Sequence, residues 1–291
     1  MRARFRRQGL WCAASLAIVV TSLLLSLCSN RAFAYSALTH EAIIDAAWDG
    51  GIAPLLRERF AGISEDELRE ARAYAYGGCI VQDMGYYPFG SMLFTDLVHY
   101  VRSGDFVEAL LEEAQPLEEY AFALGALEHY FGDAIGHTRG VNPAVGITYP
   151  KLRQRYGPLV TWADQPTAHM RVEFGFDVLQ VARGRYSLEA HSAFIGFKVA
   201  TSLLIRAFFK TYGLDLRSLL TNVDLSIGTY RHTVSEVIPA ATAIAWDMKK
   251  DDFERRIPGL RRDQFVYTPC RAPATRNNGE SSTSGQDGSP Q

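Results

Sequence analysis

The sequence predicts an all-α protein, a single multi-helix domain with a metal site between its helices. Two observations carry this prediction. Apolar residues recur at helical spacing through most of residues 35–267, and no stretch shows the sustained alternation of a strand bounded by hairpin turns. In addition, histidines and carboxylates recur at steps of four in two of the predicted helices, which places them on one helix face.

The predicted helices follow one another along the chain. The first spans residues 39–51, with Thr39 as N-cap and Gly50 as stop. The second, 64–78, opens with Ser64 and Glu67 at capping-box spacing. Further amphipathic or buried helices are expected at 103–114, 116–138, 166–184, 188–213 and 234–257, the last kinked at Pro239. The segments 77–91 and 140–164 are expected to be long and irregular.

Both ends of the chain are expected to lie outside the domain. Residues 1–34 read as a signal peptide, with a basic start, a continuous apolar run and the small residues of "AFA" before Tyr35. We expect cleavage before Tyr35 and export to the periplasm or medium. The apolar run is long enough to span a membrane, so an uncleaved signal would anchor the protein. The tail, residues 268–291, is polar, free of aromatic residues and expected to be disordered.

The composition narrows the function classes. The chain has 291 residues, a net charge of -2 and 21% charged residues, so no nucleic-acid partner is expected. Its hydrophobic share of 47% is normal for a globular protein. Two of the four cysteines lie in the signal, which leaves Cys79 and Cys270. Export permits a disulfide between them, but the sequence leaves this pairing open.

The stretch "LGALEHYFGDAIGHTRG" carries His129, Asp133 and His137 at steps of four. On an α-helix each step of four drifts only about 40° around the axis, so the three side chains line one stripe. Histidine and carboxylate bind zinc through nitrogen and oxygen. The alternative is a polar stripe that faces solvent.

Further ligand types are spread along the chain in a similar way. His169 is followed four residues later by Glu173 in "AHMRVEFGFD". His40 stands five residues after the predicted new N-terminus, and His99 lies in "FTDLVHY". Asp83 lies in the glycine-rich "GGCIVQDMGYYPFG". Because most of the chain's seven histidines fall beside spaced carboxylates, a metal site is favoured over a chance pattern.

Taken in order, "YSALTH", "QDMGYYP", "FTDLVHY", "EHYFGDAIGH" and "HMRVE" resemble the zinc-dependent phospholipase C/D group. This group includes bacterial phospholipases C and the N-terminal domain of glycosylphosphatidylinositol-specific phospholipase D. More distantly the chain resembles the fungal single-strand nucleases. The resemblance covers roughly residues 35–177.

The resemblance implies two to three zinc ions. The first would be held by Asp83, His99, His129 and Asp133, and the second by His137, His169 and Glu173. The third would be held by the amine and carbonyl of Tyr35 with His40 and again Asp133. Asp133 would thus bridge two metals, since a carboxylate has two oxygens to share.

Three details distinguish the chain within the group it resembles. The well-known members begin with Trp where this chain has Tyr35, a change that a main-chain ligand tolerates. The spacing of four between Asp133 and His137 is shorter than theirs and looks more like the phospholipase D branch. The last ligand, Glu173, matches the phospholipases, whereas the nucleases use Asp.

The resemblance implies an exported phosphodiesterase that hydrolyses phospholipids or related phosphodiesters by metal-bound hydroxide, with Asp83 as the catalytic carboxylate that orients or deprotonates the attacking water. No Ser/His/Asp triad, phosphate-binding loop or cysteine nucleophile is visible in the sequence. Transient contact with a membrane surface is conceivable and no protein partner is implied. The alternatives are a zinc-dependent single-strand nuclease and a non-catalytic module with structural zinc. The sequence fixes neither the headgroup nor the side of the phosphate that is cleaved.

The aromatic residues after Asp83 are candidates for substrate binding. Tyr86, Tyr87 and Phe89 could form a cage for a headgroup cation or contact lipid, and ordinary loop packing is the alternative. His191 and His232 match nothing in the pattern and are expected to be ordinary helix histidines.

Overall fold

The computed structural model describes residues 37–182, 197–220 and 222–233, together with isolated residues and short runs between 243 and 262. These parts form twelve α-helices with short π- and 3-10-helical turns, and no strand occurs among them. The predicted all-α class is therefore confirmed. The predicted signal, Tyr35, His191, Cys270 and the polar tail lie outside the described residues.

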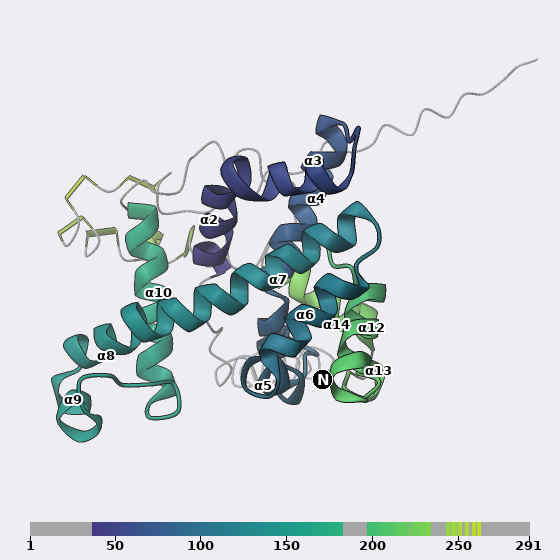
Figure 1. The fold of residues 1–291 in the computed structure, drawn as a ribbon. Coiled ribbons are helices and arrows are strands. Elements are labelled where there is room, and N and C mark those ends of the chain that lie inside the picture. Colours follow the sequence, from purple (N-terminus) through teal and green to yellow (C-terminus); the bar gives the residue numbers. More distant parts are fainter. Residues whose placement is uncertain are drawn as a thin grey trace, which may run out of the picture.

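The long helix α7 (Leu117–Gly136) runs through the middle of the fold (Figure 1). It packs most extensively against α4 (Glu65–Gly78), and also against α6 (Ser103–Glu113) and α2 (Ala37–Ala47). Glycines allow the α4–α7 approach, because a Cβ at Gly125 would lie 2.1 Å from the Ala75 carbonyl oxygen and one at Gly78 would lie 2.0 Å from that of Phe122. This close crossing sets the position of the second half of α7.

Helix α2 continues through the π-helical turn η1 (Trp48–Ile52) into α3 (Ala53–Arg59). A polar clamp ties α2 to α4: Asp45 accepts hydrogen bonds from the Arg72 guanidinium and the Tyr76 hydroxyl. The Arg72 guanidinium also lies over the Trp48 ring, 5.1 Å from its centre. Since α2 carries His40 at its start, this clamp fixes the direction from which His40 approaches α7.

The segment predicted to be irregular at 77–91 is more ordered than expected. Helix α4 extends to Gly78, and a 3-10 helix η2 (Val81–Tyr86) precedes α5 (Met92–Tyr100). The Thr95 hydroxyl donates to the Gln82 carbonyl at 2.8 Å and accepts from the Gly85 amide at 2.9 Å. One threonine of α5 therefore holds the turn that carries Asp83. The predicted capping box of Ser64 and Glu67 is present at the start of α4.

The prediction that segment 140–164 is irregular is also wrong, because this segment too is largely helical. It contains a π-helical turn η3 (His137–Val141) and two short helices, α8 (Asn142–Thr148) and α9 (Pro150–Tyr156). Their apolar residues pack with those of α10 (Pro166–Ala182) in a small core separate from the main one. A proline in the first turn of each short helix accounts for these starts, since proline suits that position.

The remaining helices close the side of α5 and α6 away from this small core. They are α12 (Thr201–Tyr212), α13 (Leu216–Leu219) and α14 (Val223–His232). The helix expected from residue 188 is helical only from Thr201 within the described part, and residues 197–200 are not in a helix. Cys79 is a buried free thiol under α7. In the part of the chain that the structure describes, no helix has the length and apolarity needed to cross a membrane.

Candidate metal centre

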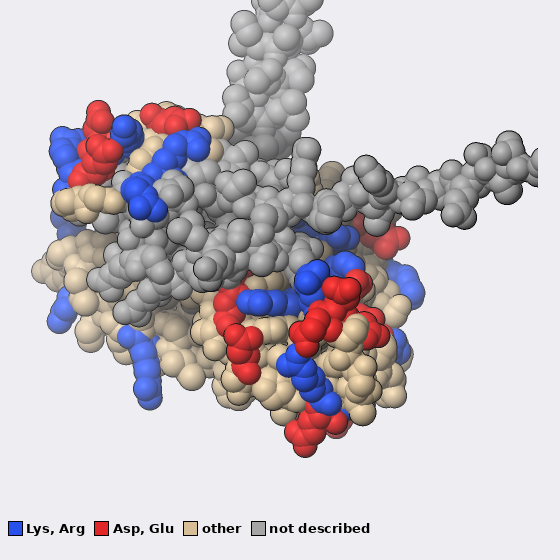
Figure 2. All heavy atoms as spheres, turned by 90° about the horizontal axis from the view of Figure 1, so that it is seen from above, with Lys and Arg blue, Asp and Glu red and all other residues tan. Residues whose placement is uncertain are grey.

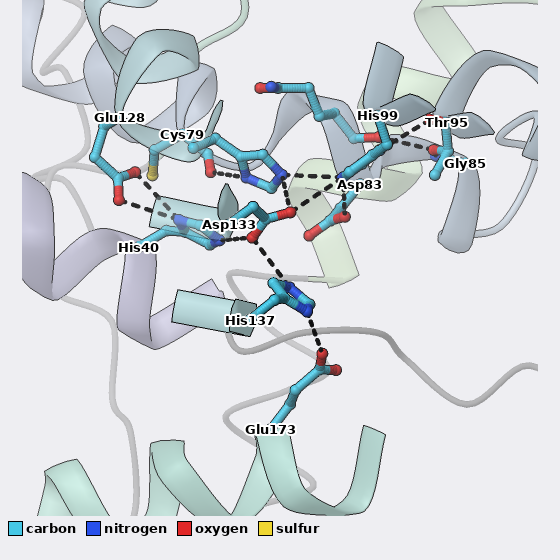
Figure 3. A network of polar contacts seen from close by, with 12 residues as sticks. His40, Cys79, Asp83, Gly85, Thr95, His99, Glu128, Asp133, His137 and Glu173 are labelled. Carbon is cyan, nitrogen blue, oxygen red and sulfur yellow. Dashed lines mark hydrogen bonds and ion pairs between the residues drawn. The ribbon is translucent and has the colours of Figure 1, made fainter. Parts of the chain in front are cut away.

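The stripe predicted on α7 forms the middle of a polar cluster. His129 Nε2 lies 3.4 Å from Asp133 Oδ2, and His137 Nε2 lies 3.3 Å from Asp133 Oδ1. His137 sits just past the end of α7, in the π-helical turn η3, and still faces the same stripe (Figure 3). The two oxygens of Asp133 therefore face different histidines, which is the arrangement that a bridging carboxylate requires.

A second group joins this stripe from η2 and α5. His99 Nε2 lies 3.4 Å from Asp83 Oδ1 and 3.1 Å from His129 Nε2. The space enclosed by these two imidazole nitrogens and the Asp83 carboxylate is so small that it fits little more than a proton or a metal cation. Asp83, His99 and His129 form one of the groups in which all ligand atoms lie within 4.8 Å of one another.

A third group comes from α10. His169 Nδ1 lies 2.7 Å from Glu173 Oε1, as expected for residues four apart on one helix face. The His137 ring stacks on that of His169 with centres 5.0 Å apart, and its Nδ1 lies 3.7 Å from Glu173 Oε1. The structure thus brings together His137, His169 and Glu173.

His40 completes the cluster from α2. Its ring stacks on that of His129 with centres 4.2 Å apart, and its Nε2 lies 3.4 Å from Asp133 Oδ1. His40, His129 and Asp133 form another group of close ligand atoms. Eight of the nine predicted ligands therefore converge around Asp133 in three adjoining groups, and the ninth, Tyr35, lies outside the described residues.

The outward-facing nitrogens of two histidines are held by backbone carbonyls. His129 Nδ1 lies 2.8 Å from the Cys79 carbonyl oxygen, and His99 Nδ1 lies 2.8 Å from that of Thr95. A carbonyl can only accept, so each Nδ1 carries a proton, and in the neutral ring it is Nε2 that offers a lone pair toward the cluster. This is the tautomer that a metal ligand needs.

Side chains hold the outward nitrogens of two others. His40 Nδ1 lies 3.1 Å from Oε1 of Glu128, whose side chain is only 8% exposed. His169 Nε2 lies 2.8 Å from Asn142 Oδ1. Such outer carboxylate and amide partners orient metal-binding histidines and make them more basic. The sequence patterns did not identify Glu128 and Asn142 as partners of the histidines. The signal available for Glu128 was that it is an acidic residue inside an otherwise apolar helical run.

The charges of the cluster shift its proton affinities. Burial alone lowers the pKa of His40, but the charges of Glu128 and Asp133 outweigh it, so the pKa lies well above its ordinary value. The pKa values of His99 and His137 are likewise raised, since contacts with Asp83 and Asp133 outweigh burial. Burial raises the pKa of Asp133, but the surrounding histidines hold it well below its usual range. The cluster therefore attracts positive charge.

The donor set fits zinc. Imidazole nitrogen and carboxylate oxygen are zinc ligands, and each group supplies three such donors. Asp83 Oδ2 and Glu173 Oε2 are buried and accept no hydrogen bond within the described residues. Buried carboxylate oxygens without partners are costly, and a bound cation would remove that cost.

The cluster opens into a cavity of about 620 Å³, a size usual for a small-molecule site. His99, His129, Asp133 and His137 form part of its wall. Asp83 is 2% exposed and does not line the cavity; its neighbour Gln82 does. The metal groups thus lie at the inner end of a space that can receive a substrate.

The aromatic residues of this wall differ from those considered in the sequence. They are Tyr100, Tyr130 and Trp162. Tyr87 is 2% exposed and packs edge-on against Tyr230 in the main core, and Phe89 is exposed away from the cavity wall. Tyr86 lies behind the wall, its ring centre 6.0 Å from that of Trp162. The structure brings none of the three to the cavity lining.

Residues 39–222 match the family described as zinc dependent phospholipase C. This match spans more than half of the chain and every described side chain of the cluster. The chain belongs to the zinc-dependent phospholipase C family. No curated protein and no solved structure matches it. The resemblance read from the ordered ligand motifs is therefore confirmed, and with it a zinc-dependent hydrolase whose family implies a phospholipid substrate.

Two histidines, His191 and His232, were not predicted to bind metal. His232 lies exposed near the end of α14, consistent with an ordinary helix histidine. His191 lies outside the described residues. The role of each residue in holding zinc, and the number of ions, stay predictions.

Proposed function

We propose that this chain is an exported zinc-dependent phosphodiesterase that hydrolyses phospholipids at the centre around Asp133. The observation that carries the proposal is the convergence of ligands from α2, η2, α5, α7 and α10 on one carboxylate at the inner end of a cavity. A purely structural zinc site has no need of a cavity, since such sites are closed by protein ligands.

The ligand assignment follows the three groups. Asp83, His99, His129 and Asp133 would hold one ion, and His137, His169 and Glu173 a second. His40 and Asp133, with the main chain of Tyr35, would hold a third. When bound, zinc supplies a water of lowered pKa and positive charge that offsets the charge of the phosphate.

The chain's own residues would position the reactants and move a proton. Hydrolysis adds the oxygen of one water to phosphorus as the ester P–O bond breaks, and the leaving alcohol oxygen takes up a proton. Asp83 has two carboxylate oxygens, Oδ1 facing His99 and Oδ2 without a hydrogen bond among the described residues, so one could hold the metal while the other accepts the proton of the water. The outer partners Glu128, Asn142 and the Cys79 carbonyl keep the histidines from turning during this transfer.

The cavity wall supports a lipid headgroup over a nucleic-acid strand. Tyr100, Tyr130 and Trp162 line it, and no Lys or Arg of the described residues does. Aromatic faces attract a cationic headgroup, whereas a polyanion needs positive charge along its path. Glu173 as last ligand supports the same choice.

A substrate panel tests the proposal. Zinc-loaded protein is given a short-chain phosphatidylcholine, a lysophospholipid and a single-stranded oligonucleotide at matched concentrations. We expect faster cleavage of the lipids, with the phosphorylated headgroup or the free headgroup in the product telling C-type from D-type cleavage. Preferential cleavage of the oligonucleotide would assign the chain to the nuclease alternative, and zinc binding without turnover of any substrate would favour the structural one.

We further propose that the chain is exported and cut before Tyr35. The basic start, the apolar run and the "AFA" triplet support this. N-terminal sequencing of the protein made by an exporting host is expected to begin at Tyr35. Recovery of the full-length chain in the membrane fraction would instead support an anchored form.

A further inference from the structure

One segment beside the cavity has an unbalanced charge. Residues 138–163, here called the basic lobe, comprise most of η3, then α8, α9 and the non-helical stretch that follows. The lobe contains four basic residues and no Asp or Glu, although the whole chain has a net charge of -2. The four are Arg139, Lys151, Arg153 and Arg155, and all are exposed.

These four cations differ from most other described cations of the chain in their ion pairing. None of the four is in an ion pair within the described residues, and Arg171 on the adjacent α10 is likewise exposed and unpaired there. Most other described cations pair with acids, as Lys210 does with Glu113 at 2.8 Å. Figure 2 shows such mixing, with acidic and basic side chains side by side in two clusters on the face that it draws. The basic lobe therefore presents positive charge that no described acidic side chain neutralises in an ion pair.

Apolar side chains stand among the cations. Ile147 is 70% exposed at the end of α8, and Leu159 is 49% exposed in the non-helical stretch. The guanidinium of Arg155 lies 4.9 Å from the ring centre of the half-buried Tyr156. Exposed aliphatic groups interleaved with Lys and Arg are typical of surfaces that enter the headgroup layer of an anionic membrane.

The basic lobe also forms part of the cavity wall. Thr138, Asn142, Thr161, Trp162 and Ala163 all line the cavity. In Figure 1, α8 and α9 project from the fold beyond the C-terminal end of α7, where the metal ligands lie. A surface that rested on this lobe would therefore meet the cavity beside it.

We propose that the basic lobe docks the protein onto an anionic lipid surface and so brings the cavity to lipid substrate. The positive charge of the lobe favours an anionic partner. Its exposed apolar side chains favour a partner with an accessible hydrocarbon layer. The choice of lipid over another polyanion rests on the proposed phospholipid substrate. Binding is therefore tested separately from turnover, so that the two proposals can fail independently.

The test compares two triple variants of the zinc-loaded protein that change the net charge equally. One is Lys151→Gln/Arg153→Gln/Arg155→Gln. The matched control is Arg57→Gln/Arg69→Gln/Arg217→Gln, which removes exposed cations that are paired with Glu65, Asp66 and Asp215. Binding to phosphatidylcholine vesicles with and without phosphatidylserine is measured by sedimentation, and turnover is measured on a water-soluble short-chain phospholipid.

We expect wild type and control to bind the phosphatidylserine vesicles alike, more weakly as salt is raised. Each basic residue near such a surface contributes about a fivefold factor, so the lobe variant should bind on the order of a hundredfold more weakly. Its turnover of the soluble lipid should stay at the wild-type level. Ile147→Ser should weaken vesicle binding in a way that salt does not mimic.

Three outcomes would overturn the proposal. They are vesicle binding by the lobe variant equal to that of the control, wild-type binding that does not depend on phosphatidylserine, and tighter binding to a single-stranded oligonucleotide than to the vesicles. The last would assign the basic lobe to a nucleic-acid partner. Equal zinc content and equal circular dichroism of the two variants check that both are folded.

Discussion

His40 is held between two carboxylates of α7, with Glu128 3.1 Å from its Nδ1 and Asp133 3.4 Å from its Nε2. The two acids are five residues apart on the helix, so they reach the imidazole ring from different sides. Gly132 lies between them, and a Cβ there would come within 3.2 Å of the His40 ring. His40 therefore has one orientation. In it Nε2 faces the proposed metal, and the Nδ1–H donates a hydrogen bond to Glu128.

Glu128→Gln should weaken zinc binding without removing a ligand. The amide can still meet the ring but no longer provides the negative charge that makes His40 a stronger donor, so we expect a loss of about tenfold to a hundredfold in affinity at one site. Zinc titration with a competing chelator measures this directly. Glu118→Gln, in the first turn of the same helix, serves as control and should leave the affinity unchanged. Equal affinities in the two variants would contradict a positioning role for Glu128.

Asp133→Ala should have the broadest effect of any single change in the centre. Its two oxygens lie within 3.6 Å of four histidines, so the variant should lose at least one zinc and on the order of a hundredfold or more in turnover. Phe131→Leu, an exposed change two residues away, should be mild. Metal analysis and phosphodiester turnover of both proteins check the comparison. Wild-type zinc content in Asp133→Ala would rule out the bridging role.

Zinc affinity should fall steeply as the pH is lowered. The pKa values of His40, His99 and His137 are raised in the zinc-free protein, and each must lose its proton before that nitrogen can bind metal. Apparent affinity should therefore decline as the pH is lowered, over a range that begins above the ordinary histidine pKa of about 6.5 because these pKa values are raised. Chelator-buffered titrations across this range measure the slope. An affinity independent of pH would contradict the protonated zinc-free cluster.

The zinc-free protein should show the opposite trend. A histidine whose pKa is raised on folding contributes stability that is full below its unfolded pKa and is lost as the pH rises through the folded pKa. The melting temperature of chelator-treated protein should thus fall as the pH rises above about 6.5, while the stabilisation by added zinc grows. If the melting temperature changed with pH in the same way with and without zinc, these histidines would not dominate the pH dependence of stability.

The sequence predicted those parts of the centre that one helix can encode. The spacing of four placed His129 beside Asp133, and His169 beside Glu173, and both pairs are in contact. The meeting of α2 with α7 depends on tertiary packing, so Glu128 gave no sign of its contact with His40. Being next to His129 in sequence, it points about 100° away around the helix.

The aromatic loop shows a case that local composition left undecided. "GYYPFG" allowed either a substrate-binding cage or ordinary loop packing, and in the structure Tyr87 packs against Tyr230 of α14. The Ser226 hydroxyl donates to the Phe89 carbonyl at 2.7 Å, a contact across 137 positions of sequence. No local pattern carries information about such a partner.

Gly125→Ala should destabilise the whole fold. The added methyl would meet the Ala75 carbonyl oxygen, which is backbone and cannot turn aside, so α4 and α7 would have to separate. We expect a loss of about 1–3 kcal/mol or more in the free energy of unfolding, measured by denaturant titration of zinc-free protein. Gly228→Ala in α14 meets nothing within 4 Å and should be neutral or stabilising. Similar stabilities for the two would mean that the helix crossing can relax.

The last prediction concerns the N-terminal amine. The resemblance assigns the amine and carbonyl of Tyr35 to one ion with His40 and Asp133, whose ligand atoms lie close together in the structure. A free amine is a good zinc ligand, whereas an amide nitrogen is a very poor one. A protein with one added residue before Tyr35 should therefore lose one zinc and most of its turnover.

The remaining ligands lie beyond Asp83 and should keep the other ions in place in the extended protein. The measurement is zinc stoichiometry and turnover of protein that begins at Tyr35 and of its one-residue extension, with both N-termini confirmed by mass. The matched control replaces Tyr35 by Trp without changing the amine, and it should keep both zinc and turnover. Equal zinc content and equal turnover in the extended protein would show that the Tyr35 amine is not a ligand and that His40 serves a metal without it.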